Sequence, residues 1–536
     1  MPIPHPGPAA LDTGASILHL ADLISRNAAE RPGHDAVRDL AGEAPLTLSW
    51  SAFDAAVSAE AARLRAAGVR PGDRVAVGLP DGAAYCVALF GALRADAVGV
   101  PFAAGSVARE LDSVFGQAGP AVVVAGPDDE AAAGTARECG ARLLGPPEVS
   151  APVPDAAPTA VPTDPKRIAL IVFTSGTTGR PRGVQLSHRA LLANREQAAA
   201  LRPAPVNAVD RVLLALPLHH VYGLAAGLLQ VCWAASTVVL PGRFDPERML
   251  SVIVDERVSV VSGVPSMFHM LLAHLGGPEG DAGRLRTALA GVRLCTSGGA
   301  PLPAAWLAEF RAAAGLDLHE GYGLSEGGPV ITSNALGRPP KPGSVGRPLP
   351  GVELRLVDAA GRPLAEARPE PDDEDEVDLD DGSEPTDDTG LIALRGPNLF
   401  SGYWPDGSGG PDDDGWYTTA DVGYLDADGD LHLVDRSSDL VIVNGFNVYP
   451  REVEQVIAEL DEVAEVAVVG VPDDRTGAAV KAVVVRAPGS ELTGEQVEEH
   501  CAARLARFKR PAVVHFADEL PRTPTGKIAR RTLARM

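Results

Sequence analysis

The stretch Ile171-Val-Phe-Thr-Ser-Gly-Thr-Thr-Gly-Arg-Pro-Arg-Gly-Val184 indicates the fold of this chain more sharply than any other segment. An apolar strand is predicted to end in six residues, Thr174–Gly179, that are only threonine, serine or glycine; basic residues follow, and a helix is predicted to open at Ser187. Glycines let backbone N–H groups turn towards an anion, and the hydroxyls add donors, so the pattern is typical of a phosphate loop. It is not a Walker A loop, because Gly179 precedes Arg-Pro instead of Lys-Ser or Lys-Thr. The alternative is a flexible surface loop.

Strand-like and helix-like segments alternate on both sides of this loop, which predicts right-handed crossovers and largely parallel sheets. The predicted helices are Trp50–Ala67 and Ala83–Ala95. The predicted strands are Val75–Leu79, Val98–Phe102, Ala121–Ala125, Arg211–Leu216 and Ser259–Val264. Antiparallel β structure is predicted from Gly390 onward, and strands Ala464–Val469 and Val480–Val485 predict a small α+β domain at the end.

The composition of the chain limits the classes of protein to which it can belong. The chain has 536 residues with 47 basic and 71 acidic side chains, a net charge of −24, so that two or more domains and no nucleic-acid partner are expected. Thirteen of the acids lie between Glu366 and Asp388, a run expected to be a solvated, disordered loop. Five scattered cysteines, no secretory signal and no apolar run of membrane-spanning length predict a cytoplasmic protein without membrane insertion.

Further segments along the chain carry motifs that can be read together with this loop. They are Pro217-Leu-His-His-Val-Tyr222, Ser297-Gly-Gly-Ala-Pro301, Gly321-Tyr-Gly-Leu-Ser-Glu326, Tyr417-Thr-Thr-Ala-Asp421, Asp435-Arg436, Gly445-Phe-Asn-Val-Tyr-Pro450 and Pro521-Arg-Thr-Pro-Thr-Gly-Lys527. Together with Thr174–Val184 they resemble, in order and over nearly the whole chain, the motifs of the adenylate-forming (ANL) superfamily, and within it the acyl-CoA synthetases of the 4-coumarate and fatty-acid CoA ligase type. The resemblance implies an α/β fold: an N-terminal domain (1–437) of parallel-sheet α/β subdomains plus a β-rich subdomain, and a small mobile α+β C-terminal domain (438–536).

The resemblance also implies a nucleotide site for ATP and AMP. Tyr322 would stack on adenine, Ser325 would contact the α-phosphate, and Glu326 would hold Mg²⁺, which prefers carboxylate oxygens. Asp421 would accept hydrogen bonds from the ribose hydroxyls, and Arg436 would contact the ribose or a phosphate. Ordinary packing of Tyr322 and solvated surface charges are the alternatives. The implied nucleotide contacts are Thr174, Ser175, Gly176, Thr177, Thr178, Gly179, Gly299, Ala300, Pro301, Gly321, Tyr322, Gly323, Ser325, Asp421 and Arg436.

An acid pocket is implied in the same way. It would comprise His220, Tyr222, Gly223, Ala226, Met267, Gly298, Pro329 and Val330, with His220 near the reacting carboxylate. Because the pocket contains no acidic residue to pair an ammonium group, an uncharged aromatic or medium-length apolar acid fits better than an amino acid. His219 and His220 are expected to point to opposite faces of a strand. A structural role for either histidine is the alternative.

The two-step logic of the superfamily implies the reaction. A carboxylic acid and ATP form acyl-AMP and pyrophosphate, with Lys527, Glu326 and His220 as catalytic residues. The small domain then turns at Ser438, and the CoA thiol, passing Gly445, displaces AMP. Ala420 stands where the superfamily usually has glycine, and Ser438 where it usually has Asp or Lys.

Other functions remain open at this stage. They are loading of a carrier-protein phosphopantetheine in trans, adenylation of an unusual acid, and a non-enzymatic nucleotide sensor, against which Glu326 and Lys527 argue. A homodimer is a possible state.

Overall fold

The computed structural model describes residues 17–42, 44–149, 164–174, 181–275, 282–335, 337–364, 389–436, 441–443, 446–448, 450–473, 477–505, 507–522 and 528–536. The chain forms two compact units. The first combines Met1–Glu353 with Leu394–Tyr417, and the second combines Leu354–Ala393 with Thr418–Met536. The predicted acidic loop between Glu366 and Asp388 lies outside the described residues.

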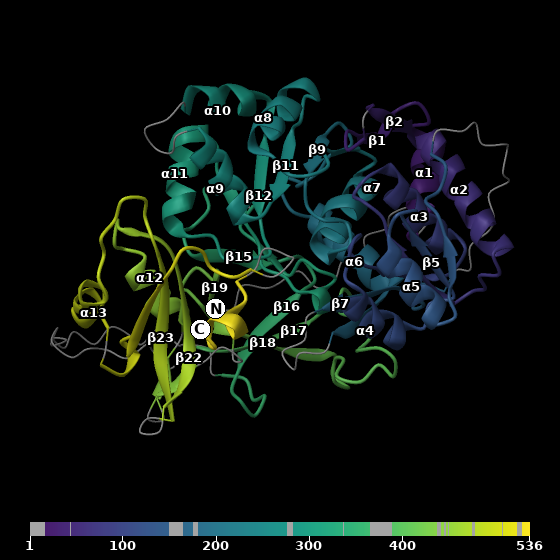
Figure 1. Ribbon diagram of the computed structural model, residues 1–536. Coiled ribbons are helices and arrows are strands. Elements are labelled where there is room, and N and C mark those ends of the chain that lie inside the picture. Colours follow the sequence, from purple (N-terminus) through teal and green to yellow (C-terminus); the bar gives the residue numbers. More distant parts are fainter. Residues whose placement is uncertain are drawn as a thin grey trace, which may run out of the picture. The chain divides into compact units, whose positions relative to one another are not determined.

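Two mostly parallel sheets form the frame of the first unit (Figure 1). One has the order β13 (Leu318–Glu320), β12 (Leu294–Ser297), β11 (Val260–Gly263), β9 (Arg211–Leu214), β10 (Thr237–Leu240), β1 (Asp35–Asp39), β2 (Leu46–Ser49). The other has the order β6 (Arg142–Leu144), β5 (Val122–Ala125), β3 (Arg74–Gly78), β4 (Val98–Pro101), β7 (Ile168–Thr174), β8 (Arg182–Ser187). Only the edge strands β2 and β8 pair antiparallel, as expected where helical crossovers join the remaining strands.

The strands are apolar on both faces because helices cover both faces. Val212 and Leu214 enter the core between the sheets, whereas Leu213 between them enters the core on the opposite face. In the second sheet, Val75 packs into the core between the sheets, and Ala76 packs into the core on the opposite face. The shared core contains residues of α1 (Asp22–Glu30), α2 (Trp50–Ala66), α3 (Ala83–Arg94), α6 (His188–Ala199), the π-helix η1 (Tyr222–Leu229) and α7 (Gln230–Ala234).

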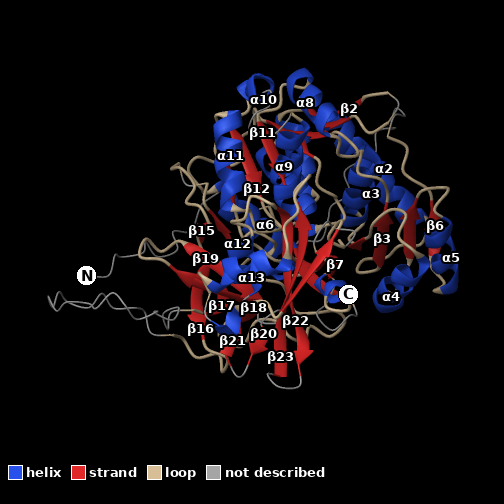
Figure 2. Cartoon of the chain, turned by 60° about the vertical axis from the view of Figure 1, so that its left-hand side comes forward, coloured by secondary structure: helices blue, strands red, loops and turns tan. Residues whose placement is uncertain are grey.

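Further helices close the outer faces, as Figure 2 shows for α8, α9 and α11 beside β11 and β12 and for α4 and α5 near β3 and β6. These helices and the short 3₁₀ turn beside them are α4 (Ala108–Ala118), α5 (Glu130–Glu138), α8 (Pro246–Asp255), α9 (Pro265–His274), α10 (Ala282–Ala288), η3 (Leu289–Gly291) and α11 (Ala304–Ala314). Serine side chains cap the N-termini of α2 and α6. The Ser49 hydroxyl accepts a hydrogen bond from the Ala52 N–H, and the Ser187 hydroxyl accepts one from the Ala190 N–H. Strands β14 (Thr332–Ser333) and β15 (Ser344–Pro348) pair antiparallel.

The second unit is a small α+β assembly. A β-rich part has the order β16 (Glu353–Val357), β17 (Gly390–Arg395), β18 (Trp416–Leu425), β19 (Leu431–Arg436). A three-stranded sheet of β22 (Val463–Asp473), β23 (Gly477–Arg486) and β24 (Val513–Ala517) buries one face against α12 (Pro450–Ile457) and α13 (Gly494–Ala502). The remaining elements are the hairpin β20 (Val441–Val443) and β21 (Phe446–Val448), the 3₁₀ turn η5 (Arg507–Lys509) and α14 (Arg530–Leu533).

The predicted fold class is confirmed, and most predicted helices and strands end within one or two residues of the observed ones. The segment after the phosphate loop differs from the prediction. The loop does not lead directly into a helix, because Arg182–Ser187 first forms β8, antiparallel to β7, with Thr174 opposite Arg182. Ser187 still caps the helix that follows. The boundary between residues 437 and 438 stays a prediction. Within the described residues, we find no helix long and apolar enough to cross a lipid bilayer.

Candidate active site

The loop after β13 is folded back on itself without room for side chains at its glycines. Gly323 forms an isolated antiparallel bridge with Val330, and the Leu324 N–H donates to the Pro329 carbonyl at 3.1 Å. A Cβ built on Gly323 would lie 2.1 Å from the Pro329 oxygen, and one on Gly321 would lie 2.8 Å from the Thr332 oxygen. This closed loop therefore holds four predicted nucleotide residues, Gly321–Gly323 and Ser325, close to the predicted acid-pocket residues Pro329 and Val330.

The half-buried 3₁₀ turn η4 (Ser325–Gly327) lies within that loop and carries the predicted phosphate and metal contacts. The Glu326 carboxylate accepts a hydrogen bond from the Tyr403 hydroxyl at 2.7 Å, and the Glu326 carbonyl accepts one from the Phe400 N–H at 2.9 Å. A partly exposed carboxylate is a hard oxygen donor, so its chemistry suits Mg²⁺. Tyr322 is buried, with 7% of its surface exposed.

The carboxyl ends of neighbouring parallel strands bring residues predicted for the acid pocket close to residues predicted for the nucleotide site, at the edge where open α/β sheets usually bind ligands. Gly298 and Gly299 directly follow β12, and Gly321 directly follows β13. A Cβ on Gly298 would lie 3.1 Å from the ring of Tyr222, whose hydroxyl donates to the Gly263 carbonyl at 3.3 Å. The small residue is therefore needed for the Tyr222 ring to pack against this strand end.

The π-helix η1 supplies one wall of the predicted pocket. Tyr222 and Ala226, one turn apart, are half-buried, whereas the remaining residues of η1 are buried. π-Helical turns are frequent at functional sites. Gly223 permits the close approach of the preceding turn, since a Cβ there would lie 2.4 Å from the Pro217 oxygen. Burial raises the pKa of Tyr222 to about 12, so its hydroxyl is a neutral hydrogen-bond donor near pH 7.

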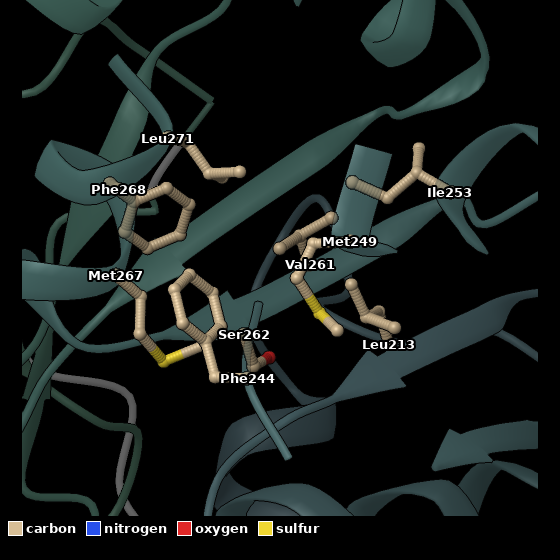
Figure 3. Close-up of a pocket in the computed structure, with 9 residues that line it drawn as sticks. All are labelled: Leu213, Phe244, Met249, Ile253, Val261, Ser262, Met267, Phe268 and Leu271. Atoms are coloured by element: carbon tan, nitrogen blue, oxygen red, sulfur yellow. The ribbon is translucent and has the colours of Figure 1, made fainter. Parts of the chain in front are cut away.

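Met267 lines a small apolar cavity between the seven-stranded sheet and the helices α8 and α9 (Figure 3). The cavity of about 10 Å³ has room for no more than one water, and an apolar cavity of this size is expected to stay dry. The Met267 Cε lies 3.6 Å from a Cβ built on Gly263, whose carbonyl binds Tyr222. Its contact with the acid stays a prediction. The cavity is lined by Leu213, Phe244, Met249, Ile253, Val261, Ser262, Met267, Phe268 and Leu271.

The expectation for the two histidines is wrong. His219 and His220 lie in a turn before η1, not in a strand, and their ring centroids are 4.4 Å apart. The turn forms because the His220 N–H donates to the Pro217 carbonyl. Burial, followed by the neighbouring His220, lowers the pKa of His219 to about 4, so His219 is neutral near pH 7.

The second unit contains the predicted ribose contacts. Asp421 and Arg436 are directly opposite each other in the antiparallel ladder of β18 and β19. Ala420 lies in β18 and is not among the described residues with positive φ, so the usual glycine is not required there. The side chain of Arg436 and the whole of Ser438, Gly445 and Lys527 lie outside the described residues, as do Ser175, Gly176, Thr177, Thr178 and Gly179.

Three side chains around the site were missed by sequence reasoning. The Asn194 amide donates to the Val330 carbonyl at 2.7 Å and accepts from the Val330 N–H at 3.1 Å, which fixes one predicted pocket residue. The hydroxyl groups of Tyr403 and Tyr417 are hydrogen-bonded to each other, and the Tyr403 hydroxyl also donates to Glu326. A fully buried asparagine in α6 was a readable signal, because buried amides need partners. Tyr417 is the first residue of one motif quoted above, although no role was assigned to it, and Tyr403 lies in none of these motifs.

Known proteins share this architecture. Residues 24–404 match the model of the AMP-binding enzyme family, and residues 452–527 match that of the AMP-binding enzyme C-terminal domain. The chain belongs to the AMP-binding enzyme family. A feruloyl-CoA synthase of Amycolatopsis sp is 36% identical over 491 residues, covering 91% of this chain and 94% of the relative. A long-chain fatty acid–CoA ligase of Mycobacterium tuberculosis is 32% identical over 488 residues, covering 88% and 89%.

Solved structures agree with this result. ATP-bound MatB from Rhodopseudomonas palustris has a TM-score of 0.83 and 32% sequence identity, covering 96% of this chain and 98% of that one. The predicted membership of the ANL superfamily is confirmed, and with it an AMP-forming acid–CoA ligase activity: adenylation of a carboxylic acid, then formation of a CoA thioester.

Proposed function

We propose that this enzyme uses ATP and Mg²⁺ to activate an uncharged aromatic or medium-length apolar carboxylic acid, and then transfers the acyl group to CoA. The observation that carries the proposal is the chemistry of the pocket wall. Tyr222, Ala226 and Gly298 offer an aromatic ring and small apolar surfaces, and none of the eight predicted pocket residues, all described, is acidic. A substrate ammonium group would be buried there without a partner, which is costly.

The relatives support an aromatic or an aliphatic apolar acid, although the aliphatic acids in their names are longer than the medium length proposed here. Among them are a feruloyl-CoA synthase, which is named for an aromatic acid, and ligases named for long-chain fatty acids. The aromatic end of that range agrees with the contact between the Tyr222 ring and Gly298, because a flat ring can pack beside such a surface.

The proposed chemistry uses the chain's own groups at each stage. The phosphate loop and Ser325 donate hydrogen bonds to the phosphates of ATP, while His220 and Tyr222 orient the acid so that its carboxylate oxygen faces the α-phosphorus. Attack forms the acyl phosphate bond and expels pyrophosphate; Lys527 stabilises the negative charge that develops. Glu326 would hold Mg²⁺, which neutralises phosphate charge when bound.

The second stage rests on the C-terminal domain, which we propose begins at residue 438 and turns at Ser438. Its rotation would carry Lys527 away and place Gly445 beside the entering thiol of CoA, where a side chain would obstruct the pantetheine arm. The thiol then attacks the acyl carbon, and AMP leaves.

A panel of acids tests the substrate class. Pyrophosphate release is measured with ATP and Mg²⁺ for hydroxycinnamic, benzoic, octanoic, palmitic and malonic acids and for phenylalanine. We expect the highest kcat/KM for a hydroxycinnamic or medium-chain acid. Phenylalanine should be among the poorest substrates, because its ammonium group finds no carboxylate. A preference for phenylalanine or for malonate would refute the proposed acid class while leaving the adenylation chemistry intact.

A further inference from the structure

The metal-ligand candidate Glu326 is connected to the strand that follows the phosphate loop by one tyrosine. We propose that Tyr403 is a positioning residue: it holds the Glu326 carboxylate in a fixed place relative to β8, so that a metal bound by Glu326 meets the phosphates of ATP in one geometry. The inference rests on the proposed role of Glu326 as the Mg²⁺ ligand, and it adds to that role a residue that need not touch metal or substrate.

The backbone around Tyr403 is attached to β8, which begins at Arg182, after the predicted phosphate loop has ended at Gly179. Tyr403 forms an isolated antiparallel bridge with Val184, and the Trp404 N–H donates to the Gly183 carbonyl at 2.7 Å. Two further backbone hydrogen bonds join Gln185 to the residues just before Tyr403. The main chain at Tyr403 therefore moves with the strand that leaves the phosphate loop.

The other end of the connection is Glu326 itself. The Tyr403 hydroxyl donates to the Glu326 Oε1 at 2.7 Å, a short hydrogen bond to a carboxylate. The Phe400 N–H also donates to the Glu326 carbonyl, so the same short segment holds both the backbone and the side chain of the glutamate. With one carboxylate oxygen bound by the tyrosine, the other can serve a cation.

The Tyr403 ring is itself held in place. Tyr403 is buried, with 9% of its surface exposed. The Phe400 ring packs edge-on against it, with the ring centroids 5.1 Å apart. Arg182, the first residue of β8, forms a cation–π contact with the Tyr403 ring. Its guanidinium lies over the face of that ring, 3.3 Å from the centroid. These contacts leave the hydroxyl little freedom to turn away from Glu326.

A second hydroxyl completes the chain of hydrogen bonds. Tyr417 lies with its oxygen 3.2 Å from that of Tyr403. Because the only hydroxyl proton of Tyr403 is donated to Glu326, Tyr417 must donate to Tyr403. A hydrogen bond that a donor itself receives strengthens the one it gives, so Tyr417 supports the contact without reaching the glutamate.

Direct measurement of metal binding tests the proposal. Mn²⁺ is titrated by electron paramagnetic resonance into the full-length enzyme saturated with a non-hydrolysable ATP analogue. Tyr403→Phe removes one oxygen and keeps the ring; we expect its Mn²⁺ affinity to fall about 10-fold, within the range found when a residue supporting a metal ligand is lost. Tyr417→Phe is the matched variant, and a smaller loss is expected. An unchanged Mn²⁺ affinity in Tyr403→Phe would overturn the proposal, even if its melting temperature fell.

Glu326→Gln separates failure of this inference from failure of the proposed function. If Glu326→Gln binds Mn²⁺ as the parent does, Glu326 is not the ligand; its proposed metal role and the positioning role of Tyr403 then both fall, whereas the proposed acid class is tested separately by the acid panel. If Glu326→Gln loses affinity and Tyr403→Phe does not, only the positioning role fails. In the double variant we expect no loss beyond that of Glu326→Gln, because the two residues act as one unit. A fully additive loss would mean that Tyr403 acts independently of Glu326, which contradicts the proposal.

Discussion

Replacing Lys527 by alanine is expected to slow acyl-AMP formation by on the order of 10²–10³, the usual loss for one electrostatic contact in a transition state. Lys527 lies outside the described residues, and the expectation rests on its motif and on the composition of the chain. Only five of the 47 basic residues are lysines, so a lysine at this position is unlike the usual choice of arginine. An ammonium group on a flexible stem can reach both the acid and the α-phosphate.

The second half-reaction distinguishes this role from loss of stability. Lys527→Ala should convert synthetic acyl-AMP and CoA to acyl-CoA at nearly the parent rate, because Lys527 is proposed to leave the site before that stage. Lys166→Ala, at an exposed position, is the control and should leave both half-reactions unchanged. Equal damage to both half-reactions by Lys527→Ala would instead indicate general destabilisation.

Gly323→Ala should reduce adenylation by on the order of 10², the cost of displacing reacting groups by about 1 Å. A Cβ at this position would lie 2.1 Å from the Pro329 oxygen, which is backbone and cannot turn aside. The loop would have to open, and Tyr322, Ser325 and Glu326 would move away from Val330. Pyrophosphate release under saturating ATP and acid measures the effect.

The control for this variant is Gly116→Ala. Gly116 lies in α4, and a Cβ there would meet no atom within 4 Å. Alanine at such a helical position removes freedom from the unfolded chain, so equal or slightly higher stability and unchanged activity are expected. If Gly323→Ala were as active as Gly116→Ala, the closed loop would not be part of the site.

The fold was predictable where one short segment carries its own signal. Trp50–Ala66 shows helical spacing, and Val122–Ala125 is an uninterrupted apolar run, so both were predicted within one residue. Strand β8 was missed because its partner is β7, and pairing across the phosphate loop outweighs the short local pattern of Arg182–Ser187.

The site was predictable by residue type but not by contact. The motifs assigned Glu326 and Tyr222, yet they gave no indication that Tyr403, 77 residues further along, donates to Glu326. Such a contact depends on the tertiary fold, which no periodicity records. The two histidines show the opposite error: a pattern rule for strands was applied to His219 and His220, although Pro217 begins a turn there.

The central claim is that the chain makes an acyl adenylate and passes it to CoA, and a pulse–chase of the intermediate tests it most directly. The enzyme is mixed with ATP, Mg²⁺ and the best acid of the panel, without CoA, and is quenched for mass spectrometry. We expect enzyme-bound acyl-AMP and about one pyrophosphate per active site, followed by acyl-CoA and AMP when CoA is added. Release of ADP and phosphate, or acyl-AMP that CoA does not consume, would contradict the claim.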